Sequence, residues 1–345
     1  MGETVSVKTS DFTYELPSSA IAQVPAEPRD SSRLLVVEGM RDHRFSELPS
    51  LLRKKDLVVV NRTRVRRARL MGTKHPSGGR AEVLLLGPLG EGRWEALVRP
   101  ARRLRAGSEI RFGGLTGRLE SAPDQGRVVL ELEADEGDVE GAIERVGQVP
   151  LPPYFSGVLD DPDRYQTVFA SDPGSAAAPT AGLHFTPEVL AGLDRRGIPV
   201  SAIDLDIGLD TFRPIASEGL GDHRMHTERF RVSGEVVAAV DRVRSEGGRV
   251  VAIGTTVVRA LESAAASGSL APAEGATGLF ITPGYRFRVV DVLLTNFHLP
   301  ASTLVVLVAA FMGEEWRRVY REALARGYRF LSFGDAMLVE RAEGT

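Results

Sequence analysis

The chain has 345 residues, of which 43% are hydrophobic and 26% are charged, as in a soluble globular protein of two domains or one large one. Its formal net charge of −3 does not indicate a nucleic-acid-binding protein, and the absence of cysteine excludes disulfides, thiol nucleophiles and cysteine-ligated zinc. The first residues lack the pattern of a signal peptide, and the longest apolar run, 304–312, is too short to span a membrane. We therefore expect a cytoplasmic protein without a membrane segment.

The first 60 residues predict two strands and a short helix. The strands are expected at 33–37 and 57–60, where apolar β-favouring residues cluster, and the helix at 46–52. These elements resemble the later α/β part of the chain more than the segment that follows them.

Residues 61–150 alternate short apolar runs with Gly and Pro every 8–12 residues, which is typical of a small antiparallel barrel or sandwich. One helix is expected in this segment, at 139–146. We predict a β domain at 61–150 that is inserted into a larger domain formed by 1–60 and 151–345.

The charge of the inserted segment is uneven. Residues 51–120 contain 17 Lys and Arg against 6 Asp and Glu, a net charge of +11, whereas 121–160 contain 2 against 9, a net charge of −7. The arginines form two clusters, which are Arg62, Arg64, Arg66, Arg67 and Arg69, and then Arg99, Arg102, Arg103 and Arg105. A charged run is usually a solvated surface, but two such clusters in one β domain also fit contact with a phosphate backbone.

From residue 151 onward strands alternate with helices, which predicts a mostly parallel sheet covered on both faces. Strands are expected at 199–205, 249–254, 278–282, 289–295 and 328–333. Helices are expected from Pro187 up to Gly197 and at 233–245, 257–266, 302–312 and 314–326.

Polar corners follow three of these strands, at 206–211, 254–256 and 295–298. Because ligands bind outside the carboxyl ends of parallel strands, the three corners would line one edge of the sheet. The corner at 254–256 opens a helix, so its N–H groups and hydroxyls can bind an anion or carboxylate, and Arg259 lies one turn further on. Each corner alone could equally cap its helix, but the convergence of three favours a ligand site.

Two further stretches combine residues that can carry chemistry. A fourth polar corner, 179–185, has small residues that let a ligand approach the backbone, although its His184 could also be an ordinary core histidine. Residues 222–228 contain two histidines and two acids, which can bind metal, transfer protons or form a structural hydrogen-bond cluster. No further ligand set accompanies them, so metal binding is the least favoured of the three.

No G-x-G-x-x-G follows a strand, and neither a P-loop nor a G-x-S-x-G is present. A Rossmann-type dinucleotide or methyltransferase site is therefore unsupported. The residues alone indicate an α/β enzyme with an inserted basic β domain and a nucleotide-like or zwitterionic ligand.

Long motifs extend along nearly the whole chain. In order, they are DFTYELP, IAQVPAEPRDSSRLLVV, DLVVVNRTRVRRARLMG, AAAPTAGLHFT, DHRMHTERF, VVAIGTTVVRALES, LFITPGYRFRVVDVLLTNFHLPASTL and YRFLSFGDAML. These motifs resemble those of the S-adenosylmethionine:tRNA ribosyltransferase-isomerase family of queuosine biosynthesis. The resemblance implies a three-layer α/β/α sandwich with an inserted small β-barrel. It also implies transfer and isomerisation of the ribosyl moiety of S-adenosylmethionine onto 7-aminomethyl-7-deazaguanine at the tRNA wobble position, giving epoxyqueuosine, adenine and methionine.

The resemblance also implies roles for individual residues. His184, His226 and Glu228 are expected to act as acid/base residues, because a proton must leave the ribose carbon beside the sulfonium. The residues expected to bind S-adenosylmethionine are Thr180, Gly182, Gly208, Thr255, Thr256, Arg259, Asn296 and His298. Those expected to contact tRNA phosphate are Arg62, Arg64, Arg66 and Arg67. No metal is expected, no cofactor beyond S-adenosylmethionine used as a substrate, and the protein is expected to be a monomer.

The corner at 206–212 departs from the family pattern. Relatives read roughly His-Val-Gly-x-Gly-Thr-Phe there, whereas this chain has Asp206 in place of the histidine and Asp210 in place of a small residue. Two added carboxylates would change the charge of a pocket and the pKa values within it. Two alternatives therefore stay open: a related enzyme that uses S-adenosylmethionine on a small molecule, and a non-catalytic RNA-binding protein.

Overall fold

The fold is taken from a computed structural model that describes residues 7–157, 159, 161–208 and 214–345. The chain divides into two compact units. The larger unit consists of Met1–Arg64, Pro152–Asp172 and Ala178–Thr345, and the smaller of Val65–Leu151 and Pro173–Ala177. The smaller unit therefore occupies most of the segment that the sequence predicts as an insertion.

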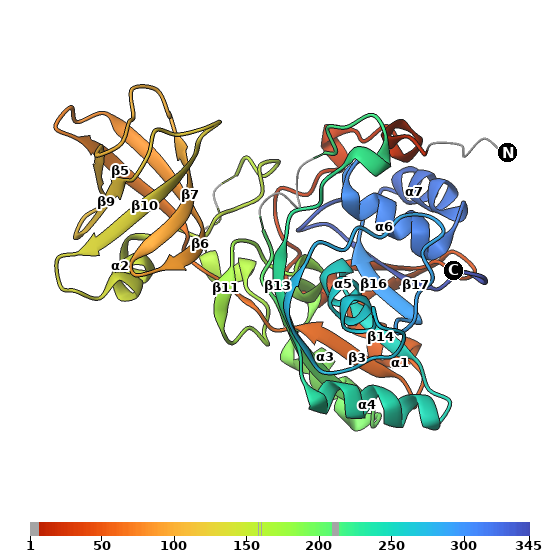
Figure 1. The fold of residues 1–345 in the computed structure, drawn as a ribbon. Coiled ribbons are helices and arrows are strands. Elements are labelled where there is room, and N and C mark those ends of the chain that lie inside the picture. The colour runs from red at the N-terminus through yellow and green to blue at the C-terminus, as the bar shows by residue number, and fades with distance from the viewer. Residues whose placement is uncertain (1–6, 158, 160, 209–213) are drawn as a thin grey trace, which may run out of the picture. The chain divides into compact units, whose positions relative to one another are not determined.

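The larger unit contains a nine-stranded sheet with the order β15-β13-β12-β3-β14-β16-β17-β1-β2 (Figure 1). Its strands are β1 (Arg33–Val36), β2 (Arg41–Arg44), β3 (Leu57–Asn61), β12 (Val200–Leu205), β13 (Glu228–Val232), β14 (Val250–Ile253), β15 (Ala273–Thr277), β16 (Val292–Asn296) and β17 (Ala336–Glu340). The central strands β12, β3, β14 and β16 run parallel, as expected. Strands β2, β13 and β15 add antiparallel pairings toward the edges, and β17 runs antiparallel to β16, so the whole sheet is mixed.

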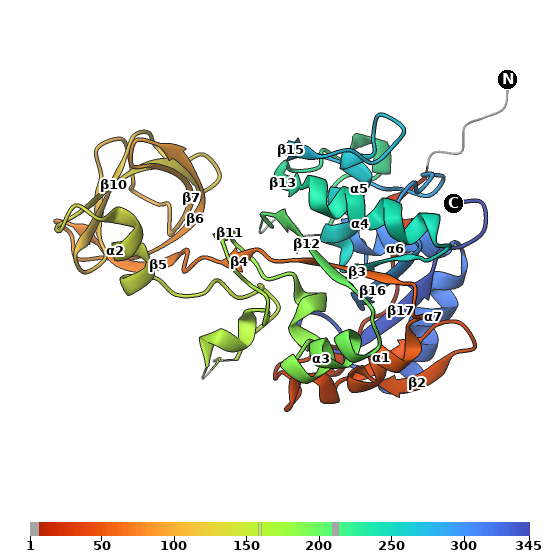
Figure 2. The same cartoon turned by 90° about the horizontal axis from the view of Figure 1, so that it is seen from below.

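Helices cover both faces of this sheet, which confirms the expected three-layer α/β/α arrangement (Figure 2). They are α1 (Leu48–Leu51), α3 (Pro187–Arg195), α4 (Gly234–Ser245), α5 (Thr255–Ala264), α6 (Thr303–Met312) and α7 (Glu315–Ala325). Alternate residues of β3 explain the layering, because Val58 and Val60 belong to the core that also contains Val189 and Leu193 of α3. On the other face, α4 and α5 contact β3 and β12.

Two strands predicted from apolar sequence are wrong. Residues 278–282 and 328–333 have no strand conformation, and the strands that the structure contains nearby are β15 and β17. The apolar character of 328–333 has another cause, because Phe330 stacks on Phe297 at 4.7 Å between ring centroids in a buried loop. An apolar run without clear periodicity cannot separate a buried loop from a buried strand.

The smaller unit is a closed antiparallel barrel with the order β10-β7-β6-β5-β8-β9, which confirms the predicted inserted β-barrel. Its strands are β5 (Arg69–His75), β6 (Arg80–Gly90), β7 (Arg93–Arg99), β8 (Glu109–Arg111), β9 (Leu115–Leu119) and β10 (Arg127–Ala134). Helix α2 (Val139–Val146) follows, where the sequence predicts it, and Asp138 caps its first turn. A separate two-stranded sheet consists of β4 (Arg64–Val65) and β11 (Pro173–Ser175).

Candidate active site

Two pockets of the larger unit lie at the ends of the parallel strands and share Thr180, Asn296, His298 and Leu304. The first, which we call the α5 pocket, is lined by Ala178, Pro179, Thr180, Ala181, Ile207, Gly254, Thr255, Thr256, Thr295, Asn296, His298 and Leu304. The second, the Tyr154 pocket, is lined by Tyr154, Thr180, Asn296, His298, Leu299, Ser302, Leu304, Leu331 and Ser332. Three of the polar corners predicted from sequence, those at 179–185, 254–256 and 295–298, therefore meet at these pockets.

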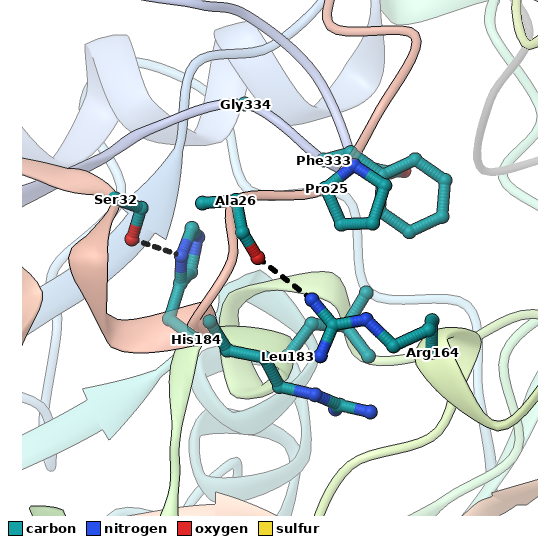
Figure 3. A pocket seen from close by; sticks show the side chains of 10 residues that line it. Pro25, Ala26, Ser32, Arg164, Leu183, His184, Phe333 and Gly334 are labelled. Carbon is teal, nitrogen blue, oxygen red and sulfur yellow. Dashed lines mark hydrogen bonds between the residues drawn. The ribbon is translucent and has the colours of Figure 1, made fainter. Parts of the chain in front are cut away.

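His184 lines a third pocket, the His184 pocket (Figure 3), and contacts Asn296, which lines the other two. The Nε2 atom of its ring is 3.1 Å from Asn296 Nδ2, and Thr180 donates a hydrogen bond of 3.0 Å to Asn296 Oδ1. Figure 3 shows the Ser32 hydroxyl pointing to the other ring nitrogen, Nδ1, at 2.7 Å. The hydrogen-bond chain from Ser32 through His184 and Asn296 to Thr180 thus joins one pocket to the other two.

This chain of partners fixes the protonation of His184. Because Asn296 Nδ2 can only donate, Nε2 of the histidine accepts, and the single ring proton resides on Nδ1 and is donated to Ser32. Burial, together with the smaller effects of the charges of Arg329 and Arg29, lowers the pKa of His184 to about 3. The ring is therefore neutral at neutral pH, and it lacks the additional proton that an imidazolium could donate as a general acid.

His298 is similarly neutral. Burial lowers its pKa to about 3, and its Nε2 atom lies 2.9 Å from the hydroxyl of Thr295 in the same corner. Its backbone is held as well, because Tyr320 is hydrogen-bonded to its N–H group and Tyr14 to its carbonyl. His298 therefore forms a fixed, uncharged part of the wall of both pockets.

A third histidine, His226, has charged neighbours. His226 Nε2 lies 3.0 Å from Glu228 Oε1, and the other carboxylate oxygen of Glu228 forms an ion pair with Arg259. Arg259 and Glu228 are 3% and 2% exposed, whereas the side chain of His226 is 19% exposed. We call these three residues the His226 cluster; its inner two members are buried and its outer member reaches solvent.

Glu228 stays ionised although it is buried. Burial alone would raise its pKa, but hydrogen bonds from His226 and Gly208 N–H and the charge of Arg259 outweigh burial and lower the pKa below its ordinary value. A fixed carboxylate that accepts the Nε2 proton of a histidine orients its ring. The cluster therefore holds the ring of His226 in one orientation beside an ionised carboxylate.

The backbone at 207–208 links the cluster to the α5 pocket. Gly208 N–H donates a 3.0 Å hydrogen bond to Glu228 Oε1, and the side chain of the preceding Ile207 lines the pocket. Asp206 accepts a hydrogen bond from the Thr63 hydroxyl at 3.3 Å. Asp210, the other unusual carboxylate, lies outside the described residues.

Two residues expected at the S-adenosylmethionine site have other surroundings. Gly182 does not line any of the three pockets, and a Cβ there would approach Phe169 and Thr167 to within 2.8 and 2.9 Å. Arg259 uses its guanidinium on Glu228 and on the carbonyls of Leu279 and Thr277, at 3.0 and 3.4 Å. Both positions favour a structural contribution over direct contact with a ligand.

Sequence analysis missed several residues of these pockets. Ser32, which contacts His184, is the clearest of these missed residues. Its sequence signal is a polar run that ends directly before the buried strand β1. Tyr154 and Ser332, whose oxygens are 2.5 Å apart, come from an irregular segment and a loop that carry no motif. Arg29 and Arg164 also line the His184 pocket. Arg29 donates to the carbonyls of Gln166 and Asp163, and Arg164 donates to the carbonyl of Ala26, as Figure 3 shows, and pairs with Glu27.

The arginines expected to contact tRNA differ in how far they are engaged. Arg62 forms a bidentate pair with Asp204, and Arg66 pairs with Glu140 and covers the ring of Trp94. Arg64 is exposed and Arg67 half-buried, and neither has an ion-pair partner among the described residues.

One end of the barrel carries further exposed arginines. They lie in or beside the 75–80 hairpin and the 100–108 loop, and are Arg80, Arg99, Arg102, Arg103 and Arg105. None of them forms an ion pair within the described part of the chain. By contrast, Arg93, Arg118 and Arg127 on the barrel strands pair with glutamates. We call the five unpaired arginines the barrel-end cluster.

Among the described residues, no group of three or more His, Asp and Glu side chains is arranged to hold a metal ion. In the same residues, no helix has the length and apolar character needed to cross a membrane.

Comparisons with known proteins agree with this architecture. The sequence model of a family described as "Queuosine biosynthesis protein" matches residues 9–339. The chain is 51% identical to the S-adenosylmethionine:tRNA ribosyltransferase-isomerase of Symbiobacterium thermophilum, over 96% of this chain and 100% of that protein. It is 52% identical to the protein of the same name from Gloeobacter violaceus, over 96% of this chain and 95% of that protein. The crystal structure of S-adenosylmethionine tRNA ribosyltransferase from Thermotoga maritima is similar with a TM-score of 0.54, at 36% identity and over 95% and 99% of the two chains.

Proposed function

The chain belongs to the family of queuosine biosynthesis proteins, and we propose that it acts as an S-adenosylmethionine:tRNA ribosyltransferase-isomerase. It transfers the ribosyl moiety of S-adenosylmethionine to 7-aminomethyl-7-deazaguanine at the tRNA wobble position and isomerises it to epoxyqueuosine. Adenine and methionine leave. S-adenosylmethionine is consumed as a substrate, no further cofactor takes part, and the enzyme works as a monomer in the cytoplasm, where both substrates occur.

The observation that carries this proposal is the pair of pockets that share Thr180, Asn296 and His298. Their position at the carboxyl ends of β14 and β16 is where open α/β sheets bind ligands. The wall formed by the neutral His298 suits a sulfonium substrate, because a positive charge there would repel it. S-adenosylmethionine binds here, with Thr255, Thr256, Asn296 and His298 as its contacts.

The reaction needs a base, because the sulfonium acidifies the neighbouring ribose carbon and its proton must be removed. We assign this role to His226, which is part-exposed and held by the ionised Glu228. Glu228 and Arg259 act through His226 as positioning residues, and Gly208 is held in the same cluster. His184 is a neutral hydrogen-bonding group that fixes Asn296 rather than a proton donor.

Phosphate contact with tRNA is assigned to the arginines that lack an ion-pair partner. These are Arg64 and Arg67 together with the barrel-end cluster, whereas Arg62 and Arg66 serve mainly their carboxylate partners. Unpaired arginines release counterions on binding a phosphate backbone, and paired ones must first lose a partner.

The activity is tested with the purified protein, S-adenosylmethionine and tRNA that carries the deazaguanine base. We expect adenine release together with a ribosyl-derived mass gain in the RNA. Liquid chromatography measures the adenine, and mass spectrometry measures the mass of the RNA. Adenine release without a mass gain in any tRNA would contradict the tRNA substrate. It would favour a small-molecule acceptor, the second candidate, for which the observation is Asp206, a carboxylate beside the pocket-lining Ile207.

The tRNA contact is tested with a triple variant, Arg99→Gln/Arg102→Gln/Arg103→Gln, against a matched triple variant of paired barrel arginines, Arg93→Gln/Arg118→Gln/Arg127→Gln. We expect the first to weaken tRNA binding and to reduce the salt slope of log K by roughly 0.7–0.9 for each phosphate contact that is lost. The KM for tRNA rises while kcat stays similar. Equal losses in both triples would show that the barrel-end cluster has no special part in RNA binding.

A further inference from the structure

The N-terminus of helix α5 has unsatisfied hydrogen-bond donors inside a pocket. The helix has 10 residues and begins at Thr255, directly after Gly254, and no side chain caps it. Its first backbone bond is the one from Val258 N–H to Gly254 O, at 3.4 Å. The N–H groups of Thr255, Thr256 and Val257 find no acceptor in the described part of the chain. Helices usually satisfy such groups with a cap, water or a ligand.

The side chain of Thr256 adds a fourth donor at the same place. Thr256 is 7% exposed, lines the α5 pocket, and its hydroxyl has no hydrogen-bond partner among the described residues. An ideal Cβ on Gly254 would lie 3.8 Å from this hydroxyl, so the oxygen is beside the helix start. Gly254 has a φ of +90°, a conformation that a residue with a side chain rarely adopts, and the missing side chain keeps this corner open. A buried hydroxyl without a partner is unfavourable unless something fills the pocket.

The other polar side chains of the pocket already have partners. Thr180 is bonded to Asn296, and Thr295 to His298. Among the described residues that line the pocket there is no Asp, Glu, Lys or Arg. What the pocket still offers is therefore a group of donors at the positive end of a helix dipole, which favours an anion. Without a basic side chain nearby, a singly charged carboxylate suits the site better than a phosphate dianion.

Helix α6 provides the contrast within the same sheet. It follows the neighbouring strand β16, but Ser302 caps it by accepting a hydrogen bond from Val305 N–H at 3.3 Å. Its first residue, Thr303, also is 7% exposed and has an unpartnered hydroxyl, yet it lines neither the α5 pocket nor the Tyr154 pocket. Thr256 and Thr303 are thus both threonines with an unpartnered hydroxyl at a helix start, but only Thr256 lines one of these two pockets.

We propose that the N-terminus of α5 binds the carboxylate of the methionyl part of S-adenosylmethionine, with the Thr256 hydroxyl as one of the donors. This inference rests on the proposed function. The carboxylate is the only anionic group of that substrate, because its amino group and sulfonium are positively charged and the adenine and ribose are neutral. Holding the carboxylate at α5 fixes one end of the substrate while the ribose reacts at the other.

The test compares S-adenosylmethionine with decarboxylated S-adenosylmethionine, which lacks only the carboxylate. The variants are Thr256→Val, which removes the hydroxyl at nearly constant volume, Thr256→Ser, which keeps it, and Thr303→Val as the matched control. Adenine release gives kcat/KM, and calorimetric titration gives the affinity for each of the two molecules.

The wild-type protein should prefer S-adenosylmethionine, and Thr256→Val should reduce that preference by about 10-fold or more, the worth of one hydrogen bond to a charged group. Thr256→Ser and Thr303→Val should retain it. An equal loss for both molecules in Thr256→Val, or the same loss of preference in Thr303→Val, would overturn the inference. If the wild-type protein binds both molecules but releases no adenine, the proposed function fails while the binding data still decide on the carboxylate site.

Discussion

Two histidines of the larger unit illustrate how surroundings decide what a side chain can do. His184 is buried among neutral partners, Ser32 and Asn296, and its ring stacks on Phe45 at 5.0 Å between centroids. His226 lies beside an ionised carboxylate that is itself paired with Arg259. The first histidine is held neutral, whereas the second lies beside a negative charge.

The comparison separates two tasks that one pocket region must perform. A neutral network can fix the direction of an amide or a hydroxyl without attracting or repelling a cationic substrate. A charged cluster can accept a proton, because the carboxylate stabilises the imidazolium that results. Sequence alone ranked both histidines equally as acid/base candidates, and their partners distinguish them.

The largest expected effect is on proton transfer. His226→Gln should lower kcat by roughly 10²–10⁴-fold, the usual contribution of a general base. His184→Gln should lower it by roughly 10-fold, the cost of a displaced Asn296 and one or two hydrogen bonds. Single-turnover adenine release under saturating substrate measures both values. A larger loss in His184→Gln than in His226→Gln would reverse the assignment of the base.

The sequence predicted more of the frame than of these partners. Hydrophobic periodicity and the spacing of Gly and Pro were sufficient to predict the inserted barrel, helix α2 and the parallel centre of the sheet. They also placed Thr255 and Asn296 at strand ends, since polar residues that follow a buried strand can be recognised in the sequence. Ser32 becomes a partner of His184, and Arg259 a partner of Glu228, only through the fold, because 152 residues separate the first pair and 31 the second.

The choice of β17 as a strand of the sheet shows a second limit. The apolar run at 328–333 resembles a strand because its aromatic side chains are buried, but they pack in a loop and leave the strand to β17. Which of two neighbouring apolar runs pairs with β16 depends on tertiary contacts, which a local pattern does not contain.

The second prediction addresses the charged cluster through stability. Arg259→Met leaves the carboxylate of Glu228 buried without its main counter-ion, which should lower the free energy of unfolding by about 3–5 kcal/mol. The double variant Arg259→Met/Glu228→Gln should recover most of that loss, because no buried charge then remains. Urea unfolding measures both.

Arg317, which pairs with Glu314 on the surface of α7, is the control for this pair of variants. Arg317→Met should change the free energy of unfolding by less than about 1 kcal/mol. If Arg259→Met lost no more than the control, the buried pair would not be what holds Glu228 in place.

The smallest effect concerns pH and compares the two clusters directly. His184 and His298 have pKa values of about 3 in the folded protein, against about 6.5 when unfolded. Between these values the unfolded chain binds more protons, so the free energy of unfolding falls as pH decreases, by about 1.4 kcal/mol per pH unit for each histidine. Glu228 has a lowered pKa, so its contribution is lost only at more acidic pH, below the unfolded value of a glutamate.

Urea unfolding at several pH values from 7 down to 5 therefore isolates the neutral histidines. His184→Gln should reduce the slope of the free energy of unfolding against pH in this range by the contribution of one histidine. Glu228→Gln should lower the free energy of unfolding but leave the slope nearly unchanged. An unchanged slope in His184→Gln would mean that His184 is protonated in the folded protein. The neutral network would then be a charged one, and the difference between the two histidines on which the choice of His226 as base depends would disappear.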